Sequence, residues 1–313
     1  MKNHQTLNIP GGVWSAAPSP FTKDMKLDEP SVGRMIKHHF RLGIKGLFLL
    51  GTNGEGPWMP EDQRRQLVRL VADHVKGRIP LAVQVTDNSA ARILRNIDMA
   101  KDAGADIAVI APPHFLVRSE PKAILEVYLE AVRNSSLPVG IYDRGAFGAV
   151  KVPDQILRKI YAEEKVVMIK DSSANPERRR IALQAKNQRP ALVVLNGDEF
   201  NCVEYLKAGY DGLLLGGGIF NGCLAGQIMA AVADGDYGLA ERLQSRMSRI
   251  MFAVYGGKKI KCWLSGEKQL LVDIGIFSTN RNYPNYPLTD SCRRAISRVL
   301  LTKDEWLFPV EKA

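Results

Sequence analysis

The sequence lacks the features that mark membrane, secreted and metal-binding proteins. No apolar run reaches the roughly 18 residues that a membrane span requires. The polar first ten residues lack the apolar stretch of a signal peptide. The four cysteines among 313 residues are scattered, without a CxxC pair or the spacing of a metal site. We therefore expect a cytoplasmic protein with reduced thiols and no bound metal.

Acidic residues are fewer than basic ones, with 33 Asp and Glu against 43 Lys and Arg and a net charge of +10. The basic residues are spread along predicted helices and do not form arms, which argues against nucleic acid as a partner. The densest run, Arg178-Arg179-Arg180, falls early in a predicted helix, and we interpret it as a solvated face. The positive balance suits attraction of small anionic substrates.

Short apolar runs alternate with amphipathic stretches along the chain. The length, with 45% apolar and 24% charged residues, suits one α/β barrel with additional helices. The runs are continuous, as in parallel strands that are buried on both faces. Eight of them are found, at residues 13–17, 46–50, 81–85, 107–111, 139–142, 166–169, 192–195 and 212–215.

Helix start signals stand between these runs, at Ser31, Pro60-Glu61-Asp62 and Ser119-Glu120-Pro121. Eight strand–helix units in succession favour a closed (β/α)₈ TIM barrel of the α/β class, and an open doubly wound sheet is the alternative. After about Gly222 the strand signals stop and helical patterns continue. We therefore predict a barrel at residues 1–222 and a C-terminal helical extension at residues 223–313, with helices at 239–254, 259–274 and 289–300.

A barrel of this kind carries its active site at the carboxyl ends of its strands. Lys170 directly follows the run at 166–169, so its stem leaves the barrel core toward that end. Partial desolvation lowers the pKa of such a lysine and yields the neutral amine that attacks a ketone. A lysine paired with Asp171 or another acid fits the position equally well.

Tyr142 ends the neighbouring run at 139–142. A phenol close to an amine can pass protons to and from a carbinolamine and a substrate hydroxyl. The alternative is an aromatic residue that only packs at the rim. The place of Tyr142 on the strand next to Lys170 favours the proton-transfer role.

The loop Gly51-Thr52-Asn53-Gly54-Glu55 follows the second run. Its two glycines allow a tight turn that brings N–H groups toward an anion. Thr52 and Asn53 add side-chain donors, which suit a carboxylate. Glu55 is interpreted as a structural residue that bonds the amides of the loop.

The sequence resembles the dihydrodipicolinate synthase/N-acetylneuraminate lyase family of class I aldolases. The order and spacing of three segments carry this resemblance: Gly51 to Glu55, Tyr142, and Ile169-Lys170-Asp171-Ser172-Ser173. Ser19-Pro20-Phe21 also matches, and the resemblance extends from about Gly11 to Leu300. It implies a Schiff base on Lys170, Tyr142 as acid and base, Thr52 and Asn53 on the carboxylate of a pyruvyl unit, and a barrel that commonly forms tetramers.

The sequence departs from the synthase branch of this family after the fifth strand. In Tyr142-Asp143-Arg144-Gly145-Ala146-Phe147, Phe147 stands where the synthase branch has the arginine that holds the second substrate. Lysine biosynthesis is therefore not expected. Arg144 is a candidate for a distal acid, and an outward salt bridge is equally compatible. Family members that resemble 4-hydroxy-2-oxoglutarate aldolases and some 2-keto-3-deoxy sugar acid aldolases carry asparagine at the position of Asn53. The amide of this residue can still donate a hydrogen bond to a carboxylate.

Three other strand ends carry candidate substrate contacts. His114 stands about where the family has a tyrosine that relays protons across a subunit interface; it can act as a relay, or bond the backbone at the rim. Asp198 and Glu199 stand about where lyase-like members hold substrate hydroxyls. Gly216, in Gly216-Gly217-Gly218, leaves room beside the Schiff base, and a phosphate cradle is the alternative.

The resemblance and the strand ends together predict a pyruvate-forming aldolase. Its substrate is a small anionic 2-keto acid, either a 4-hydroxy-2-oxo acid or a 2-keto-3-deoxy sugar acid, and it requires no cofactor. Thr52 is expected to orient Tyr142. We expect a homotetramer or homodimer. Two alternatives stay open: a 2-keto-3-deoxy acid dehydratase that uses the same imine, and a non-catalytic keto-acid-binding barrel.

Overall fold

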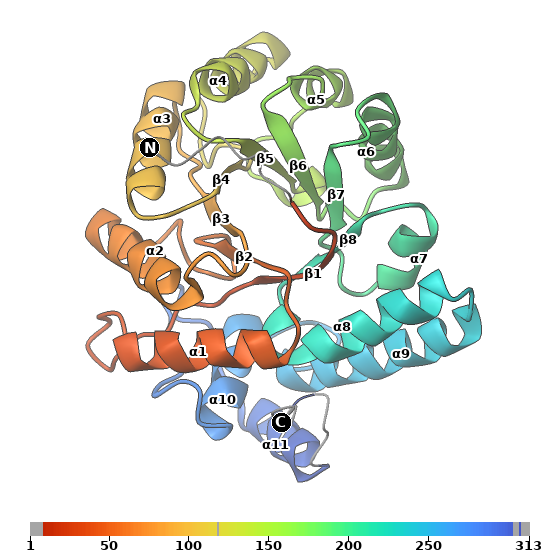
Figure 1. The fold of residues 1–313 in the computed structure, drawn as a ribbon. Coiled ribbons are helices and arrows are strands. Elements are labelled where there is room, and N and C mark those ends of the chain that lie inside the picture. The colour runs from red at the N-terminus through yellow and green to blue at the C-terminus, as the bar shows by residue number, and fades with distance from the viewer. Residues whose placement is uncertain (1–8, 118, 303–306, 308–313) are drawn as a thin grey trace.

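The computed structural model describes residues 9–117, 119–302 and 307 (Figure 1). Residues 1–8, on which the signal-peptide prediction largely rests, lie outside this part. Eight parallel strands close into one barrel in the order β1 to β8, which confirms the predicted TIM barrel. The strands are β1 (Gly12–Ala16), β2 (Gly46–Leu49), β3 (Leu81–Gln84), β4 (Ile107–Ile110), β5 (Val139–Asp143), β6 (Val166–Asp171), β7 (Val193–Asn196) and β8 (Gly212–Leu215).

Helices follow the strands and surround the barrel, as Figure 1 shows along its axis. Their starts carry the expected signals: the Asp28 side chain caps the first helix by accepting from Ser31 N–H, and Pro121 opens the fourth. The helices around the barrel are α1 (Glu29–Arg41), α2 (Glu61–Val75), α3 (Ala90–Asp102), α4 (Pro121–Asn134), α5 (Asp154–Tyr161), α6 (Pro176–Gln188), α7 (Cys202–Lys207) and α8 (Gly218–Ala233), with a short 3₁₀ turn η1 (Gly145–Phe147) after β5.

The barrel interior is filled by side chains from alternate strand positions, because successive residues of a strand point to opposite faces. Trp14, Phe48 and Met168 belong to this inner cluster, and each is fully buried. Lys170 lies two positions beyond Met168 on β6, so it faces the same interior. Asp171 has the opposite parity and faces the helices.

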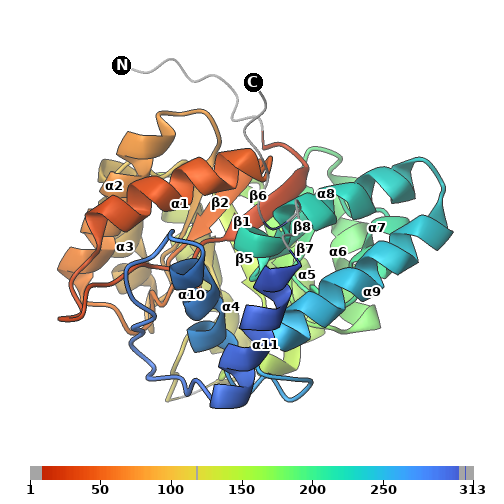
Figure 2. The same ribbon diagram turned by 90° about the horizontal axis from the view of Figure 1, so that it is seen from below.

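Within the described residues, three helices follow the barrel, as predicted: α9 (Tyr237–Val254), α10 (Trp263–Asp273) and α11 (Asp290–Leu301). In Figure 2 they lie together along one side, with α9 against α8 and α11 against α9 and α10. The predicted boundary at residues 222/223 falls inside α8, which is the eighth barrel helix, so we place the start of the extension after Ala233. No helix in the described part is long and apolar enough to cross a bilayer.

We predicted that Arg178, Arg179 and Arg180 form a solvated helix face, but Arg178 is not solvated. Its side chain is mostly buried and is paired with Asp143 at 3.4 Å and Asp154 at 2.8 Å. Arg179 and Arg180 are paired with acids at the surface, as a solvated face would allow. The difference arises because the outward face of β5 presents Asp143 to the first turn of α6.

Candidate active site

Lys170 and Tyr142 lie side by side at the carboxyl ends of β6 and β5, where they are register partners. Both are nearly inaccessible, at 5% and 8% exposure. The Lys170 Nζ lies 4.3 Å from the ring centroid of Tyr142 and 4.7 Å from that of Phe48. The lysine amine therefore sits between two aromatic rings at the top of the barrel interior.

The Lys170 environment favours a neutral amine. Burial lowers its pKa, and the nearby Tyr142 and Glu199 offset only part of this effect. The alternative of a Lys170–Asp171 pair does not fit, because the Asp171 carboxylate accepts from Tyr210 Oη at 2.7 Å and from Ser173 N–H at 2.9 Å on the other face of β6.

The Tyr142 hydroxyl is held by neighbours that favour its ionised form. Burial alone raises the pKa of Tyr142, but the charges of Lys170 and Arg144 and hydrogen bonds with Thr52 and Ser172 outweigh it, so the net pKa is lowered. The predicted contact between Thr52 and Tyr142 is therefore present. Ser172 was not predicted as a site residue, although it stands two positions after Lys170.

The loop after β2 is tight for a reason other than the predicted one. Positive φ angles occur at Leu50 (58°) and Glu55 (60°), whereas Gly51 and Gly54 are not among the residues with positive φ. A Cβ at Gly51 would lie 2.5 Å from the Phe48 ring. Gly51 is thus required for close packing on the residue that contacts Lys170, and strain is held by its non-glycine neighbours.

We predicted that the Asn53 amide binds a substrate carboxylate, but in the structure this amide bonds other parts of the protein. Its Nδ2 donates to Ala16 O (2.8 Å), Gly216 O (3.2 Å) and Glu267 Oε1 (3.1 Å), which exceeds its two hydrogens. Asn53 therefore ties β1, β8 and α10 together. The backbone N–H groups of Thr52 and Asn53 have no acceptor among residues 9–117, 119–302 and 307, and they are the donors that the loop leaves for an anion.

Glu55 is structural, as interpreted from the sequence, but its partners come from the C-terminal extension. It forms an ion pair with Lys268 of α10, and both side chains are fully buried. Its other oxygen accepts from Tyr283 N–H at 2.7 Å. Sequence reasoning missed Lys268, because nothing local in α10 indicates which loop it meets.

Glu199 faces the site, whereas Asp198 does not. The Glu199 carboxylate accepts from Gly217 N–H (2.8 Å) and from Tyr255 Oη (2.9 Å), and its charge acts on Lys170. Burial raises its pKa, and these bonds offset only part of the rise. The Asp198 carboxylate, predicted as a substrate contact, instead accepts from groups of its own loop, Phe200 N–H and Asn201 Nδ2. A Cβ at Gly216 would lie 3.4 Å from Glu199 Oε1, so this glycine keeps the space beside the carboxylate free.

Glu267 of α10 is a second acid that the sequence did not reveal. It is fully buried, and burial raises its pKa well above the ordinary value for glutamate, although Asn53 donates to its Oε1. Its Oε2 has no partner in the described part of the protein. These surroundings favour the neutral form of the Glu267 carboxyl group.

Arg144 lies over the Tyr142 ring, and His114 lies within reach of the Arg144 charge. The Arg144 guanidinium lies 6.0 Å from the Tyr142 ring centroid, and its charge acts on Lys170, Tyr142 and His114. No ion pair of Arg144 is found among the described residues, so the outward salt bridge does not form there. Partial desolvation, and then the Arg144 charge, lower the pKa of His114 and favour its neutral ring.

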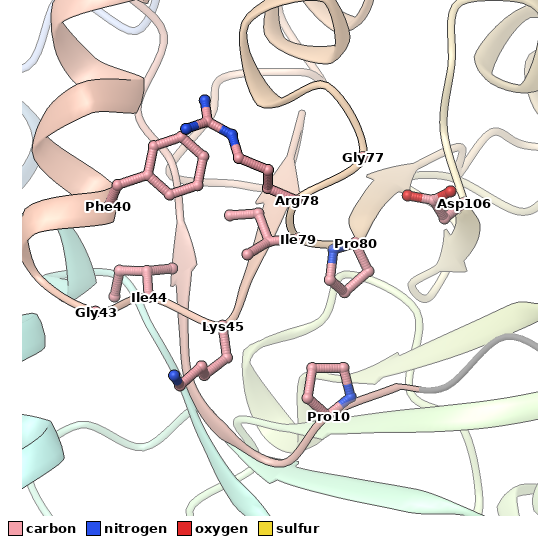
Figure 3. A pocket seen from close by; sticks show the side chains of 10 residues that line it. All are labelled: Pro10, Phe40, Gly43, Ile44, Lys45, Gly77, Arg78, Ile79, Pro80 and Asp106. Atoms are coloured by element: carbon pink, nitrogen blue, oxygen red, sulfur yellow. The ribbon is translucent and has the colours of Figure 1, made fainter.

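The opposite end of the barrel carries a cavity of about 540 Å³, between the loops that lead into β2 and β3 (Figure 3). Arg78 donates to His74 O and Val75 O and lies 3.9 Å from the Phe40 ring centroid, and Asp106 accepts from Leu81 N–H. None of the predicted site residues lines it. We interpret this end as structural, in keeping with the general division of barrels.

Comparisons with known proteins agree with this geometry. A model of the dihydrodipicolinate synthetase family matches residues 9–302. A 4-hydroxy-tetrahydrodipicolinate synthase of Rhodopseudomonas palustris is 25% identical over 93% of this chain and 95% of its own. YagE of Escherichia coli, described as a candidate 2-dehydro-3-deoxy-D-gluconate aldolase, is 27% identical over 72% of this chain and 75% of its own. The structure of a dihydrodipicolinate synthase from Bacteroides thetaiotaomicron superposes with a TM-score of 0.85 at 26% identity, covering 95% of this chain and 100% of that one.

Proposed function

Because the chain belongs to the dihydrodipicolinate synthetase family, we propose that it is a lyase that binds its 2-keto acid as a Schiff base on Lys170. The observation that carries the proposal is the register pairing of Lys170 with Tyr142 at the carboxyl end of the barrel. A buried amine with a lowered pKa suits the nucleophile that imine formation requires, and a phenol with a lowered pKa beside it gives up its proton more readily than an ordinary tyrosine.

The reaction that suits this pair is a retro-aldol cleavage. The Lys170 amine attacks C2 of the keto acid, and the carbinolamine loses water to give the protonated imine. Tyr142 accepts the C4-hydroxyl proton, the C3–C4 bond breaks, and the electron pair moves into the imine as an enamine while an aldehyde leaves. A proton returns to C3, and hydrolysis releases pyruvate and the free lysine.

The carboxylate of the keto acid is assigned to the loop after β2. The backbone N–H groups of Thr52 and Asn53 are its donors in this proposal, because the Asn53 side chain is engaged by the scaffold. Glu199 and Arg144 are assigned to the leaving half, where a carboxyl group suits a substrate hydroxyl and a guanidinium suits a distal acid. We therefore favour a 4-hydroxy-2-oxo acid or a 2-keto-3-deoxy sugar acid as substrate.

We also propose that this enzyme is not the synthase of lysine biosynthesis. Phe147 stands at the position where the synthase branch carries an arginine, and this phenylalanine is 66% exposed. A phenyl ring cannot form the charged bonds that a second carboxylate needs. Pyruvate with aspartate semialdehyde should give no condensation product, and formation of that product at a rate typical of a good substrate would refute this point.

An oligomer, a homotetramer or homodimer, is part of the proposal because the family is typically oligomeric. Light scattering on the purified protein tests it. A single species with the mass of one chain would count against this part and would leave the Schiff-base chemistry untouched.

The central test is chemical trapping. The protein is incubated with pyruvate and borohydride, digested, and analysed by peptide mass spectrometry, with Lys170→Met as the matched control. We expect one reduced pyruvyl group on the peptide that contains Lys170 and none in the variant. Absence of the adduct would remove the proposal. Product analysis with 2-keto-3-deoxy acids then separates the aldolase from a dehydratase, since only the aldolase releases pyruvate.

A further inference from the structure

Arg178 of α6 reaches the loop that joins β5 to α5, residues 144–153, and bonds it at both ends. Its Nη1 lies 3.4 Å from Asp143 Oδ2, at the start of the loop. Its Nη2 donates to Val152 O, and its Nε lies 2.8 Å from Asp154 Oδ1, at the far end. The planar fork of one guanidinium therefore holds the two ends of this loop together.

This clamp lies behind the reacting residues and is largely removed from water. The side chains of Arg178 and Asp143 are 12% and 4% exposed. Because side chains alternate along a strand, Asp143 lies on the opposite face of β5 from Tyr142, which directly precedes it. The clamp thus meets β5 next to Tyr142 without entering the space assigned to the substrate.

Asp143 passes this hold on to the backbone at the start of the loop. Its Oδ1 accepts from Gly145 N–H at 2.8 Å, and its backbone oxygen accepts from Ser172 N–H at 2.9 Å. Gly145 has a φ of 49°, and a Cβ on it would lie 2.7 Å from Ser173 Cβ. The chain therefore leaves β5 in one fixed direction, against the loop that follows β6.

Arg144 stands between the two residues that are fixed in this way. Its guanidinium lies 6.0 Å from the Tyr142 ring centroid, and its charge acts on Tyr142. In the described part of the chain the Arg144 guanidinium has no hydrogen bond or ion pair. Its place over Tyr142 therefore depends on the backbone that carries it.

We propose that Arg178 is a positioning residue of the active site, which holds Arg144 over Tyr142 by bonding both ends of the loop between β5 and α5. Arg178 does not touch the substrate and acts through the loop. The role of Arg144 toward the leaving half of the substrate rests on the proposed function, whereas its hold by Arg178 is measured on the unliganded protein. A clamp with a merely structural role would stabilise the fold without affecting Tyr142.

The first measurement is hydrogen exchange over residues 144–152, read by mass spectrometry on the whole protein. Arg178→Lys keeps a cation beside Asp143, but an ammonium group cannot bond the three acceptors of the guanidinium fork. We expect faster exchange of the loop in Arg178→Lys. Arg180→Lys, at an exposed residue of the same helix that is paired with Glu177, is the matched control and should exchange like the wild type. Equal loop exchange in Arg178→Lys and the wild type would overturn the inference.

The second measurement is an ultraviolet titration of Tyr142, in which each variant is compared with its own Tyr142→Phe counterpart. The Arg144 charge favours the ionised phenol, so displacement of the loop in Arg178→Lys should raise the pKa of Tyr142. Arg144→Met should raise it too, and adding Arg178→Lys to that variant should raise it no further, because both changes remove the same interaction. An unchanged Tyr142 pKa in Arg178→Lys, or shifts that add, would contradict positioning through Arg144.

Asp154→Ala guards against a folding defect, since it removes one bond of the clamp at a residue whose side chain is 48% exposed. It should shift both readings in the same direction as Arg178→Lys, by a smaller amount.

Turnover tests the consequence for the substrate. With 2-keto acids that carry a distal carboxylate, Arg178→Lys should lower kcat/KM about tenfold or more, and an unchanged kcat/KM would overturn the positioning of Arg144 toward the substrate. A missing pyruvate adduct on Lys170 of the wild type would refute the lyase but would leave the exchange and the titration valid, so the two failures are distinguishable.

Discussion

Glu267→Gln should make the protein more stable at neutral pH, although it changes a fully buried residue. Glutamine keeps the shape of the neutral acid and the oxygen that accepts from Asn53. The folded state raises the pKa of Glu267 well above its ordinary value of about 4.3 in an unfolded chain. Between these two pKa values the folded state retains a proton that the unfolded state has lost, so wild-type stability falls as pH rises.

The size of the effect follows from one proton. Each pH unit in that window costs the wild type about 1.4 kcal/mol, so the advantage of Glu267→Gln should be larger at pH 7 than at pH 5, by about 1.4 kcal/mol for each pH unit that lies in the window. The assay is urea unfolding at both pH values. Glu241→Gln, at an exposed position of α9, is the control for loss of a carboxyl group. An advantage of Glu267→Gln that is the same at pH 5 and pH 7 would mean that Glu267 is ionised when folded, and our account of it would be wrong.

Three further substitutions test the site and its support. Tyr142→Phe should lower kcat for aldol cleavage about 10²- to 10⁴-fold while the pyruvate adduct on Lys170 still forms, and an unchanged kcat would exclude the phenol as the proton carrier. Gly197→Ala places a Cβ 1.9 Å from Ser172 Oγ and 3.0 Å from Lys170 Cε, so both side chains must shift and adduct formation should slow about tenfold or more in a stopped-flow assay. Gly226→Ala, with open space around it, should not change that rate. Lys268→Met leaves the buried carboxylate of Glu55 without its counter-charge and should cost about 3–5 kcal/mol of unfolding free energy in urea, and a cost below 1 kcal/mol, about that of an exposed pair, would contradict the buried pairing.

The barrel and the Lys170–Tyr142 pair could be predicted because each depends on short-range pattern. Continuous apolar runs mark buried parallel strands, and a residue that directly follows such a run comes to the carboxyl end of the barrel whatever its neighbours are. Because successive residues of a strand point to opposite faces, Lys170 of β6 faces the barrel interior and Asp171 faces the helices.

The partners of the loop after β2 could not be predicted in this way. Lys268 and Glu267 belong to a helix whose sequence resembles any buried amphipathic segment, and only tertiary packing brings it under Glu55 and Asn53. The prediction for Asn53 missed that an amide has only two hydrogens. Once backbone oxygens and Glu267 take them, none is left for a substrate.

The C-terminal helices therefore belong to the site and are not an appendage. Three residues at the barrel mouth each take a buried partner from these helices: Glu55 from Lys268, Asn53 from Glu267, and Glu199 from Tyr255. Without the extension, the buried carboxyl groups of Glu55 and Glu199 would lose these partners, and the charge of Glu199 acts on Lys170. A barrel that ended at Ala233 would thus lack the contacts that fix the loop after β2 and the hydroxyl group that holds the Glu199 carboxyl group. The extension thus acts on the Lys170 site indirectly, through its contacts with Glu199 and with the loop after β2.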